Sequence, residues 1–365
     1  DFLSAPATEQ TREAYMAALF AEIGGRAKDY SDRTVTSIFI GGGTPSLLSG
    51  EQIGQLMDRI REQFAMAQDA EITMEVNPGT ASAEKLRNFY TAGINRLSIG
   101  MQSAQAEELK NLGRIHDFEG FCQVYREAVE AGFTNINVDI MSGLPGQTLA
   151  SYRDTLEKVL HLEPMPQHIS AYSLIVEEGT PFAAMAERGE LPLPEEETER
   201  AMYEETIEVL AKYGFHRYEI SNYARDGYEC RHNVGYWIRR DYLGFGIGAA
   251  SLIDNVRFQN EKSLGAYLAH PLESREEEQT LTVQDRMEET MFLGLRLTRG
   301  VSCVDFAEQY GRTVEEVYGE VIARNVADGL LTVTERKENQ KKDRFLALTK
   351  RGLDLSNYVM AQFLF

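Results

Sequence analysis

Five short apolar segments of this chain are each followed by polar or glycine-rich residues, and this repeated pattern constrains the fold more than any other feature. The segments and the residues that follow them are 35–40 before 41–46, 72–74 before 75–78, 96–101 before 102–103, 136–140 before 143–146, and 168–176 before 177–180. Such segments predict β-strands. In a β/α barrel, the active site is built at the carboxyl ends of the strands. We therefore expect the residues that follow the strands to form one large site at one edge of a parallel sheet.

Segments with helical periodicity alternate with these strands. They cover residues 51–64, 82–92, 105–113, 118–131 and 149–162. This alternation predicts βαβ units, whose right-handed crossovers bring every strand's carboxyl end to the same edge. A further amphipathic helix is expected over residues 8–26, before the first visible strand. The strand that should precede this helix is therefore expected upstream of Asp1.

The chain is expected to consist of three parts, because its character changes near Pro192. A helix over residues 199–213 and a strand over residues 217–220 should complete a barrel domain over residues 1–225. An aromatic and glycine-rich connecting segment should follow over residues 226–281. A mainly helical C-terminal module is expected over residues 282–365.

The expected order of elements in the C-terminal module is that of a winged helix. Helices are predicted over residues 301–310, 313–328 and 350–363, and a pair of strands over residues 331–334 and 345–348. The segment is not strongly basic, as a DNA-binding winged helix would be. We therefore interpret it as a packing module.

Composition excludes several classes of function. The net charge of −20 at pH 7 argues against general binding to nucleic acid or anionic lipid, since both require a basic surface. No apolar stretch approaches the ~20 residues of a transmembrane helix, and no leader segment opens the chain. These features predict a cytoplasmic protein. The three cysteines, Cys122, Cys230 and Cys303, are too far apart to give a metal-ligand spacing.

Four polar residues near the predicted strand ends, Glu75, Gln102, Arg114 and Asp139, form a candidate binding site. Two acids, an amide and a guanidinium can hold a zwitterionic ligand that carries a ribose, since arginine binds a carboxylate through two hydrogen bonds. Taken singly, each residue is also explained as a salt-bridge partner. The glycines of residues 41–43 let the backbone approach a ligand closely, although a tight turn alone would also use them. The segment lacks the Gly-Lys-Ser/Thr ending of a phosphate-binding loop.

Six motifs, in order along the chain, resemble the radical S-adenosylmethionine proteins of the coproporphyrinogen-dehydrogenase-like group. They are GGGTPS, EVNP, RLSIGMQS, LGRIH, VDIMSGLPGQT and SAYSLIVEEGTPF. The resemblance implies a partial, TIM-like (β/α)6 barrel that holds a [4Fe-4S] cluster and S-adenosylmethionine. It also implies which residues contact S-adenosylmethionine, and His116 could line the same site. The implied contacts are Gly43, Thr44, Pro45, Glu75, Gln102, Arg114 and Asp139.

The sequence departs from this group in one respect, since the CxxxCxxC loop that binds the cluster is missing. Residues 1–4 resemble those that follow the third cluster cysteine. The resemblance therefore implies that the cluster ligands lie upstream of Asp1. We expect residues 1–365 alone to hold no cluster, because thiolates are needed to anchor one.

The segment from His232 to Trp237 distinguishes two branches of the group. One branch, the dehydrogenases, oxidatively decarboxylates coproporphyrinogen III. The other branch, the HemW-type haem chaperones, binds haem and passes it on, and it is characterised by the pattern HNxxYW that this segment matches. The resemblance implies that His232 is a candidate haem-iron ligand and that Tyr236 and Trp237 cover a porphyrin face. Cys230 is a candidate second ligand.

We therefore expect a haem carrier that transfers haem to an acceptor protein, such as a respiratory enzyme at the membrane, with the cluster and S-adenosylmethionine supporting release. Two alternatives stay open. One is the radical dehydrogenase, and the other is a non-radical lyase or aldolase with Glu75 and Asp139 as acid and base. His232 could equally be a structural histidine, and Trp237 a core residue.

Overall fold

The computed structural model describes residues 8–273, 275–338 and 341–364. The chain forms two compact units that interleave along the sequence. The first contains the chain up to His216, with residues 221–229 and 265–272 added. The second contains residues 217–220 and 230–264, and the chain from Glu273 onwards.

The first unit is built on a curled sheet with the strand order β1-β2-β3-β4-β5-β7-β6. Strands β1 to β5 pair in parallel, whereas β7 pairs antiparallel with β5. The bounds are β1 Thr34–Ile40, β2 Ala65–Val76, β3 Arg96–Gln102, β4 Ile136–Ser142, β5 His168–Ser173, β6 His216–Arg217 and β7 Asn222–Ala224. This sheet is the expected partial β/α barrel.

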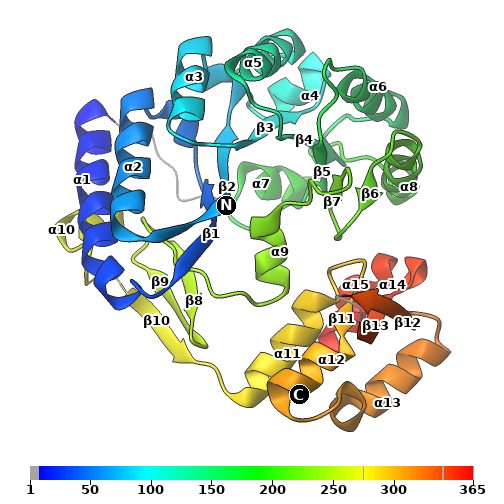
Figure 1. Ribbon diagram of the computed structural model, residues 1–365. Coiled ribbons are helices and arrows are strands. Elements are labelled where there is room, and N and C mark those ends of the chain that lie inside the picture. Colours follow the sequence, from blue (N-terminus) through cyan, green and yellow to red (C-terminus); the bar gives the residue numbers. More distant parts are fainter. Residues whose placement is uncertain (1–7, 274, 339–340, 365) are drawn as a thin grey trace. The chain divides into compact units, whose positions relative to one another are not determined.

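Helices cover the outer face of this sheet (Figure 1). They are α1 Glu9–Arg26, α2 Gly50–Gln63, α3 Ala83–Thr91, α4 Ala106–Asn111, α5 Phe118–Ala131, α6 Leu149–Leu160 and α8 Glu196–Lys212. The short helix α7 Pro181–Glu187 is instead seen on the inner side of the curled sheet (Figure 1). Local signals fix their ends. Ser49 forms a capping box with Gln52 at the start of α2. Gly132, with φ of 110°, ends α5 in the left-handed conformation that glycine adopts most easily.

The two faces of the curled sheet differ in chemistry because side chains alternate along each strand. The face that the helices cover is apolar, and Leu97, Ile99 and Val138 on it are completely buried. The opposite, inner face is polar. Its side chains include Thr73, Arg96, Ser98, Asn137, Asp139, His168 and Ser170. The inner face therefore offers hydrogen-bonding groups where a closed barrel would have an apolar core.

Three predicted strands of the barrel differ from those observed. The strand expected over residues 217–220 is wrong: β6 ends at Arg217, and the strand that pairs with β5 is Asn222–Ala224. The physical reason is the side chain of Arg217, whose guanidinium binds the carbonyl oxygens of Glu219 and Ile220. The strand expected over residues 168–176 ends earlier, at Ser173, and β2 is longer than predicted.

The second unit contains two small sheets. Strands β8 Ala250–Ile253, β9 Val256–Asn260 and β10 Arg275–Thr280 form an antiparallel sheet. Strands β11 Val301–Ser302, β13 Lys341–Leu348 and β12 Leu331–Glu338 form the other. The helices are α9 Arg231–Trp237, α11 Val283–Gly294, α12 Cys303–Tyr310, α13 Val314–Ala327, α14 Lys350–Asp354 and α15 Ser356–Ala361.

The C-terminal part of the second unit has the winged-helix order that the sequence predicts. Its core is one hydrophobic cluster that includes Met291, Phe306 and Phe363. The strand pair β12–β13 is confirmed as an antiparallel hairpin. The terminal helix predicted over residues 350–363 is instead divided into α14 and α15, because Leu355 has φ −112° and ψ 28°, outside the helical range.

One short helix from late in the sequence belongs to the first unit. Within α10 (Leu264–Ala269), Tyr267 is completely buried and donates a hydrogen bond of 2.8 Å to the buried carboxylate of Glu22 on α1. Arg26 pairs with the same carboxylate at 3.0 Å. This buried cluster of Tyr267, Glu22 and Arg26 fixes α10 to α1. No helix among the described residues is long and apolar enough to cross a membrane.

Candidate functional site

The turn after β1 brings its backbone against the carboxylate of Glu75 on β2. Gly42 N–H donates to Glu75 Oε2 at 3.2 Å. A Cβ atom at Gly41 would lie 2.7 Å from Glu75 Cδ, so a larger residue there would displace the Glu75 side chain. A Cβ at Gly43 would meet nothing within 4 Å. The backbone around Gly43 is therefore open to a ligand.

Ser46 holds the end of the turn after β1, next to Thr44 and Pro45. Its hydroxyl is completely buried, accepts a hydrogen bond from Asn77 N–H at 3.0 Å and shares one of 2.6 Å with the Thr80 hydroxyl. Lys85 Nζ donates to the Ser46 carbonyl oxygen at 2.8 Å. The segments that follow β1 and β2 are thereby joined into one wall of the site.

The two acids of the site, Glu75 and Asp139, both have raised pKa values. Burial, and then the charge of Asp139, raise the pKa of Glu75 to about 7, while the hydrogen bond from Gly42 opposes the shift. Burial also raises the pKa of Asp139, although hydrogen bonds from Asn137, Ser170 and Ser98 oppose it. Two buried acids with raised pKa values at one edge of the sheet form a site suited to a positively charged or hydroxyl-bearing ligand.

A network of side chains on the inner face of the sheet orients Asp139. Asn137 Nδ2 donates to Asp139 Oδ1 at 2.7 Å, and Ser98 Oγ donates to Oδ2 at 3.2 Å. His168 Nδ1 donates a hydrogen bond of 2.6 Å to the amide oxygen of Asn137. Burial and the charge of Arg96 lower the pKa of His168, so its imidazole is neutral. The carboxylate of Asp139 is thus held in one orientation.

Gln102 and Arg114 complete the set of predicted contacts. Gln102 is buried at the end of β3 and has φ of 69°, which is unusual for a residue other than glycine. Arg114 is half-buried, and its guanidinium makes no hydrogen bond or ion pair with any residue that the structure describes. Burial lowers the pKa of Arg114, and the charge of Asp139 opposes the shift. His116 bonds to the carbonyl oxygen of Met101, directly before Gln102, at 3.3 Å.

The structure therefore brings the predicted polar residues together. Direct contact joins the turn after β1 to Glu75, and charge interactions join Asp139 to both Glu75 and Arg114. Gln102 pairs with Ile140, next to Asp139, across the β3–β4 ladder. The supporting residues Arg96, Ser98, Asn137, His168 and Ser170 were not recognised from the sequence. The sequence pattern that could have identified them is the polar residue at every second position of β3, β4 and β5.

In the second unit, His232 and Tyr236 lie one turn apart on α9 and contact each other. His232 Nε2 and the Tyr236 hydroxyl share a hydrogen bond of 3.0 Å, and the rings meet edge to face. Tyr242 packs against Tyr236 with ring centroids 4.7 Å apart. The structure thus places an imidazole within a small aromatic cluster.

Trp237 has different neighbours from His232 and Tyr236. The guanidinium of Arg296 stacks on its indole ring, 4.3 Å from the ring centroid, and pairs with Glu219 at 3.7 Å. Cys230 precedes α9 and is completely buried. The indole is therefore already covered on one face by a cation.

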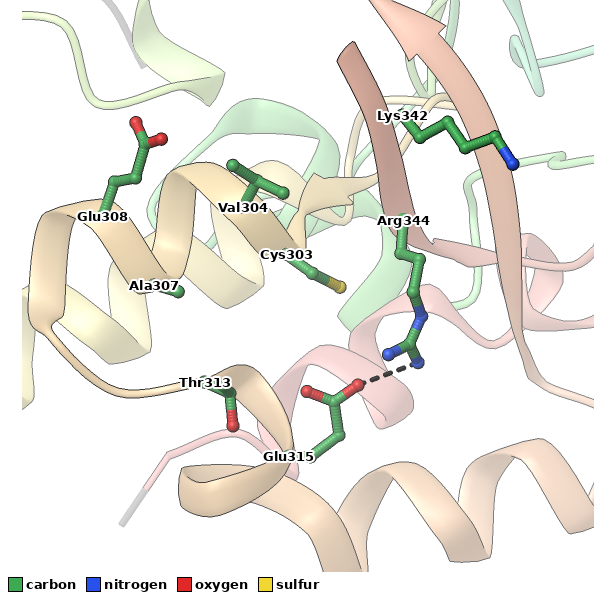
Figure 2. Close-up of a pocket in the computed structure, with 8 residues that line it drawn as sticks. All are labelled: Cys303, Val304, Ala307, Glu308, Thr313, Glu315, Lys342 and Arg344. Atoms are coloured by element: carbon green, nitrogen blue, oxygen red, sulfur yellow. Dashed lines mark ion pairs between the residues drawn. The ribbon is translucent and has the colours of Figure 1, made fainter.

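Cys303 lines a pocket of about 350 Å³ within the C-terminal part of the second unit (Figure 2). Arg344 and Glu315, which also line it, form an ion pair of 2.8 Å. Burial raises the pKa of the Cys303 thiol to about 11, and so the thiol is protonated at neutral pH. This pocket carries no reactive thiolate.

The described residues contain no group of three or more histidines, cysteines or acids that could hold a metal ion. No disulfide bond joins Cys122, Cys230 or Cys303 to another described residue. The residues that the structure describes thus fit S-adenosylmethionine through their donors and acceptors, but they do not fit an iron–sulfur cluster. The interpretation of residues 1–4 as the end of a cluster loop lies outside the described residues.

Two family models match the chain. The radical SAM superfamily matches residues 6–159, which contain the turn after β1 and all four polar contacts. The HemN C-terminal domain matches residues 281–355, in the second unit.

Similar proteins share both units. The chain is 38% identical to "Heme chaperone HemW" of Bacillus subtilis (strain 168), over 97% of this chain and 92% of that protein. It is 35% identical to the protein of the same name from Escherichia coli (strain K12), over 89% and 85%. Among solved structures, coproporphyrinogen III oxidase (HemN) from Escherichia coli, described as a radical SAM enzyme, matches with a TM-score of 0.83 and 26% identity, over 100% of this chain and 86% of that one.

The raised pKa of Glu75 predicts a pH-dependent gain in stability on Glu75→Gln. Between pH 4.5 and about 7, the folded protein keeps a proton that the unfolded chain releases, so stability falls as the pH rises through this window. Above pH 7, the raised pKa of Glu75 corresponds to a cost of up to about 3 kcal/mol. Relative to wild type, we expect Glu75→Gln to gain stability at pH 8 but little at pH 4.5, as measured by urea denaturation.

The matched control is Glu84→Gln, at an exposed position in the same unit. It should change stability by less than ~0.5 kcal/mol at both pH values. An equal effect of Glu75→Gln at pH 4.5 and pH 8 would show that burial does not perturb this carboxyl group.

Proposed function

Because the chain belongs to the HemW family of heme chaperones, which are radical SAM proteins, we propose that it binds haem and transfers it to an acceptor protein. The observation that best supports this function is the sequence similarity to HemW proteins, which extends over both units. The HNxxYW segment adds local support, since it places His232 on α9 with Tyr236 one turn away. The acceptor would be a haem-dependent protein, such as a respiratory enzyme at the membrane, and the proposed compartment is the cytoplasm.

S-adenosylmethionine would bind at the edge of the partial barrel, against the turn after β1. Asp139 and Glu75 accept hydrogen bonds from ribose hydroxyls or an ammonium group, and Arg114 is available for a carboxylate or another acceptor. Gln102 supplies an amide between them, and the backbone of Gly43, Thr44 and Pro45 forms the remaining wall. When bound, S-adenosylmethionine supplies a sulfonium group that a reduced [4Fe-4S] cluster can cleave. The chain's own residues bind and orient it.

Haem would bind at α9 through the imidazole of His232, since imidazole is a common axial ligand of haem iron. In the structure, Nε2 of this imidazole is engaged by the Tyr236 hydroxyl. Ligation through Nε2 requires that this hydrogen bond break. The ring of Tyr236 then remains beside the histidine, where it can pack on the porphyrin.

The substitution His232→Ala tests the proposed haem ligand. We expect it to weaken haem binding by at least about tenfold, because a metal–imidazole bond is lost. The measurement is a haem titration followed by the Soret band, with His161→Ala as the control at an exposed histidine. Unchanged affinity and an unchanged Soret spectrum in His232→Ala would exclude His232 as the ligand.

The substitution Tyr236→Phe should strengthen haem binding. It keeps the aromatic ring but removes the hydroxyl that competes for His232 Nε2, and a hydrogen bond of this kind contributes ~0.5–1.5 kcal/mol. The expected gain in affinity is about two- to tenfold. Tyr358→Phe, at an exposed position in the same unit, is the control. A loss of affinity in Tyr236→Phe would mean that the hydroxyl itself binds haem.

The similarity in fold to coproporphyrinogen III oxidase favours a second candidate function, the radical dehydrogenase. An anaerobic assay of the intact, cluster-containing protein with coproporphyrinogen III distinguishes the two. We expect haem binding and no formation of protoporphyrinogen IX. Turnover of coproporphyrinogen III would instead establish the dehydrogenase.

A further inference from the structure

Glu108 on α4 is a buried carboxylate that the proposed binding site does not use. Its side chain is 5% exposed and accepts three hydrogen bonds: from Ser103 Oγ at 2.6 Å, from Gln147 Nε2 at 3.0 Å and from Ser151 Oγ at 2.6 Å. Among the described residues it pairs with no cation. A buried carboxylate is costly unless hydrogen bonds satisfy it, so these three donors account for its burial.

The three donors lie in the segments that follow two neighbouring strands, β3 and β4. Ser103 follows β3, whereas Gln147 belongs to the loop after β4 and Ser151 to the first turn of α6. Gln147 extends these contacts, because it also donates to the Met141 carbonyl oxygen and accepts from Leu144 N–H. One carboxylate thus joins the loop after β3 to the loop after β4.

The loop after β3 begins at a strained residue. Gln102 has φ of 69° and is 8% exposed. A non-glycine residue keeps this conformation only when its surroundings enforce it, and such residues concentrate at functional sites. Ser103, the next residue, is completely buried and is held by Glu108. Its hydroxyl also accepts a hydrogen bond from Gln105 N–H at 2.9 Å, which closes the turn.

Ser103 makes a third contact through its backbone. Ser103 N–H donates to the Met101 carbonyl oxygen at 2.9 Å, so the turn encloses Gln102 on both sides. On the next residue, Ala104 N–H donates to Thr155 Oγ1 on α6 at 3.1 Å. The conformation of Gln102 therefore depends on groups that lie outside the binding site.

We propose that Glu108 is a positioning residue for S-adenosylmethionine binding: through Ser103 it holds Gln102 in its left-handed conformation, with the amide directed to the cofactor. This inference rests on the proposed function of the site around Glu75 and Asp139. Charge explains why the residue is an acid, since a carboxylate forms stronger hydrogen bonds to three donors than a neutral amide does.

Two serine substitutions separate positioning from general stabilisation. Ser103→Ala and Ser151→Ala each remove one hydroxyl that donates to Glu108 at 2.6 Å, and each serine also takes part in a local turn or cap. Only Ser103 adjoins Gln102. In the intact protein with its cluster reconstituted, we expect Ser103→Ala and Glu108→Ala to weaken S-adenosylmethionine binding by about tenfold. Ser151→Ala should stay within about twofold of wild type.

Hydrogen exchange without S-adenosylmethionine provides the second measurement, which does not depend on the proposed function. The amides of Ser103, Ala104 and Gln105 should exchange faster in Ser103→Ala and Glu108→Ala than in Ser151→Ala. Equal exchange and equal affinity in the two serine variants would overturn the inference. If the wild-type protein failed to bind S-adenosylmethionine while the exchange pattern was as expected, the proposed function would be wrong and the positioning role of Glu108 would stand.

Discussion

The burial of two neighbouring acids, Glu75 and Asp139, is the constraint on which the rest of the first unit depends. Glu75 lies on β2 and Asp139 on β4, with β3 between them, and the charge of Asp139 still raises the pKa of Glu75. Burial increases the cost of this repulsion because water no longer screens the carboxylates. The chain offsets the cost with a backbone amide at Gly42 and with the hydrogen bonds of Asn137 and Ser98. These contacts hold the acids in place without removing their capacity to bind a ligand.

This constraint explains why the inner face of the sheet is polar. A closed β/α barrel fills its interior with branched apolar side chains, whereas this partial barrel carries Arg96, Asn137 and His168 there. The charge of Arg96 opposes the rise in the pKa of Asp139, and Asn137 donates a hydrogen bond to its carboxylate. His168 acts through Asn137, to which it is hydrogen-bonded. In such a partial barrel, polar groups that can bind a ligand extend across the inner face of the sheet. The apolar outer face, which the helices cover, stabilises the fold.

The sequence predicted those parts of the fold that local signals determine. The bounds of α5 were predicted correctly because Asp117 caps its start and Gly132 its end. Glu75, Gln102 and Asp139 were predicted because each lies at or near the end of a strand. The antiparallel strand β7 was missed, since three residues give no periodic pattern and their pairing with β5 is a long-range interaction. Glu108 was missed for the same reason: its partners at positions 147 and 151 are distant in sequence.

The most direct test of the account is a crystal structure of the intact protein with S-adenosylmethionine bound. The account predicts that the ribose of the cofactor contacts Glu75 or Asp139, that Gln102 and Arg114 lie within hydrogen-bonding distance of the cofactor, and that the backbone of Gly43 lines the same cavity. A cofactor bound elsewhere, with Glu75 and Asp139 keeping only their contacts to other residues of the protein, would contradict it.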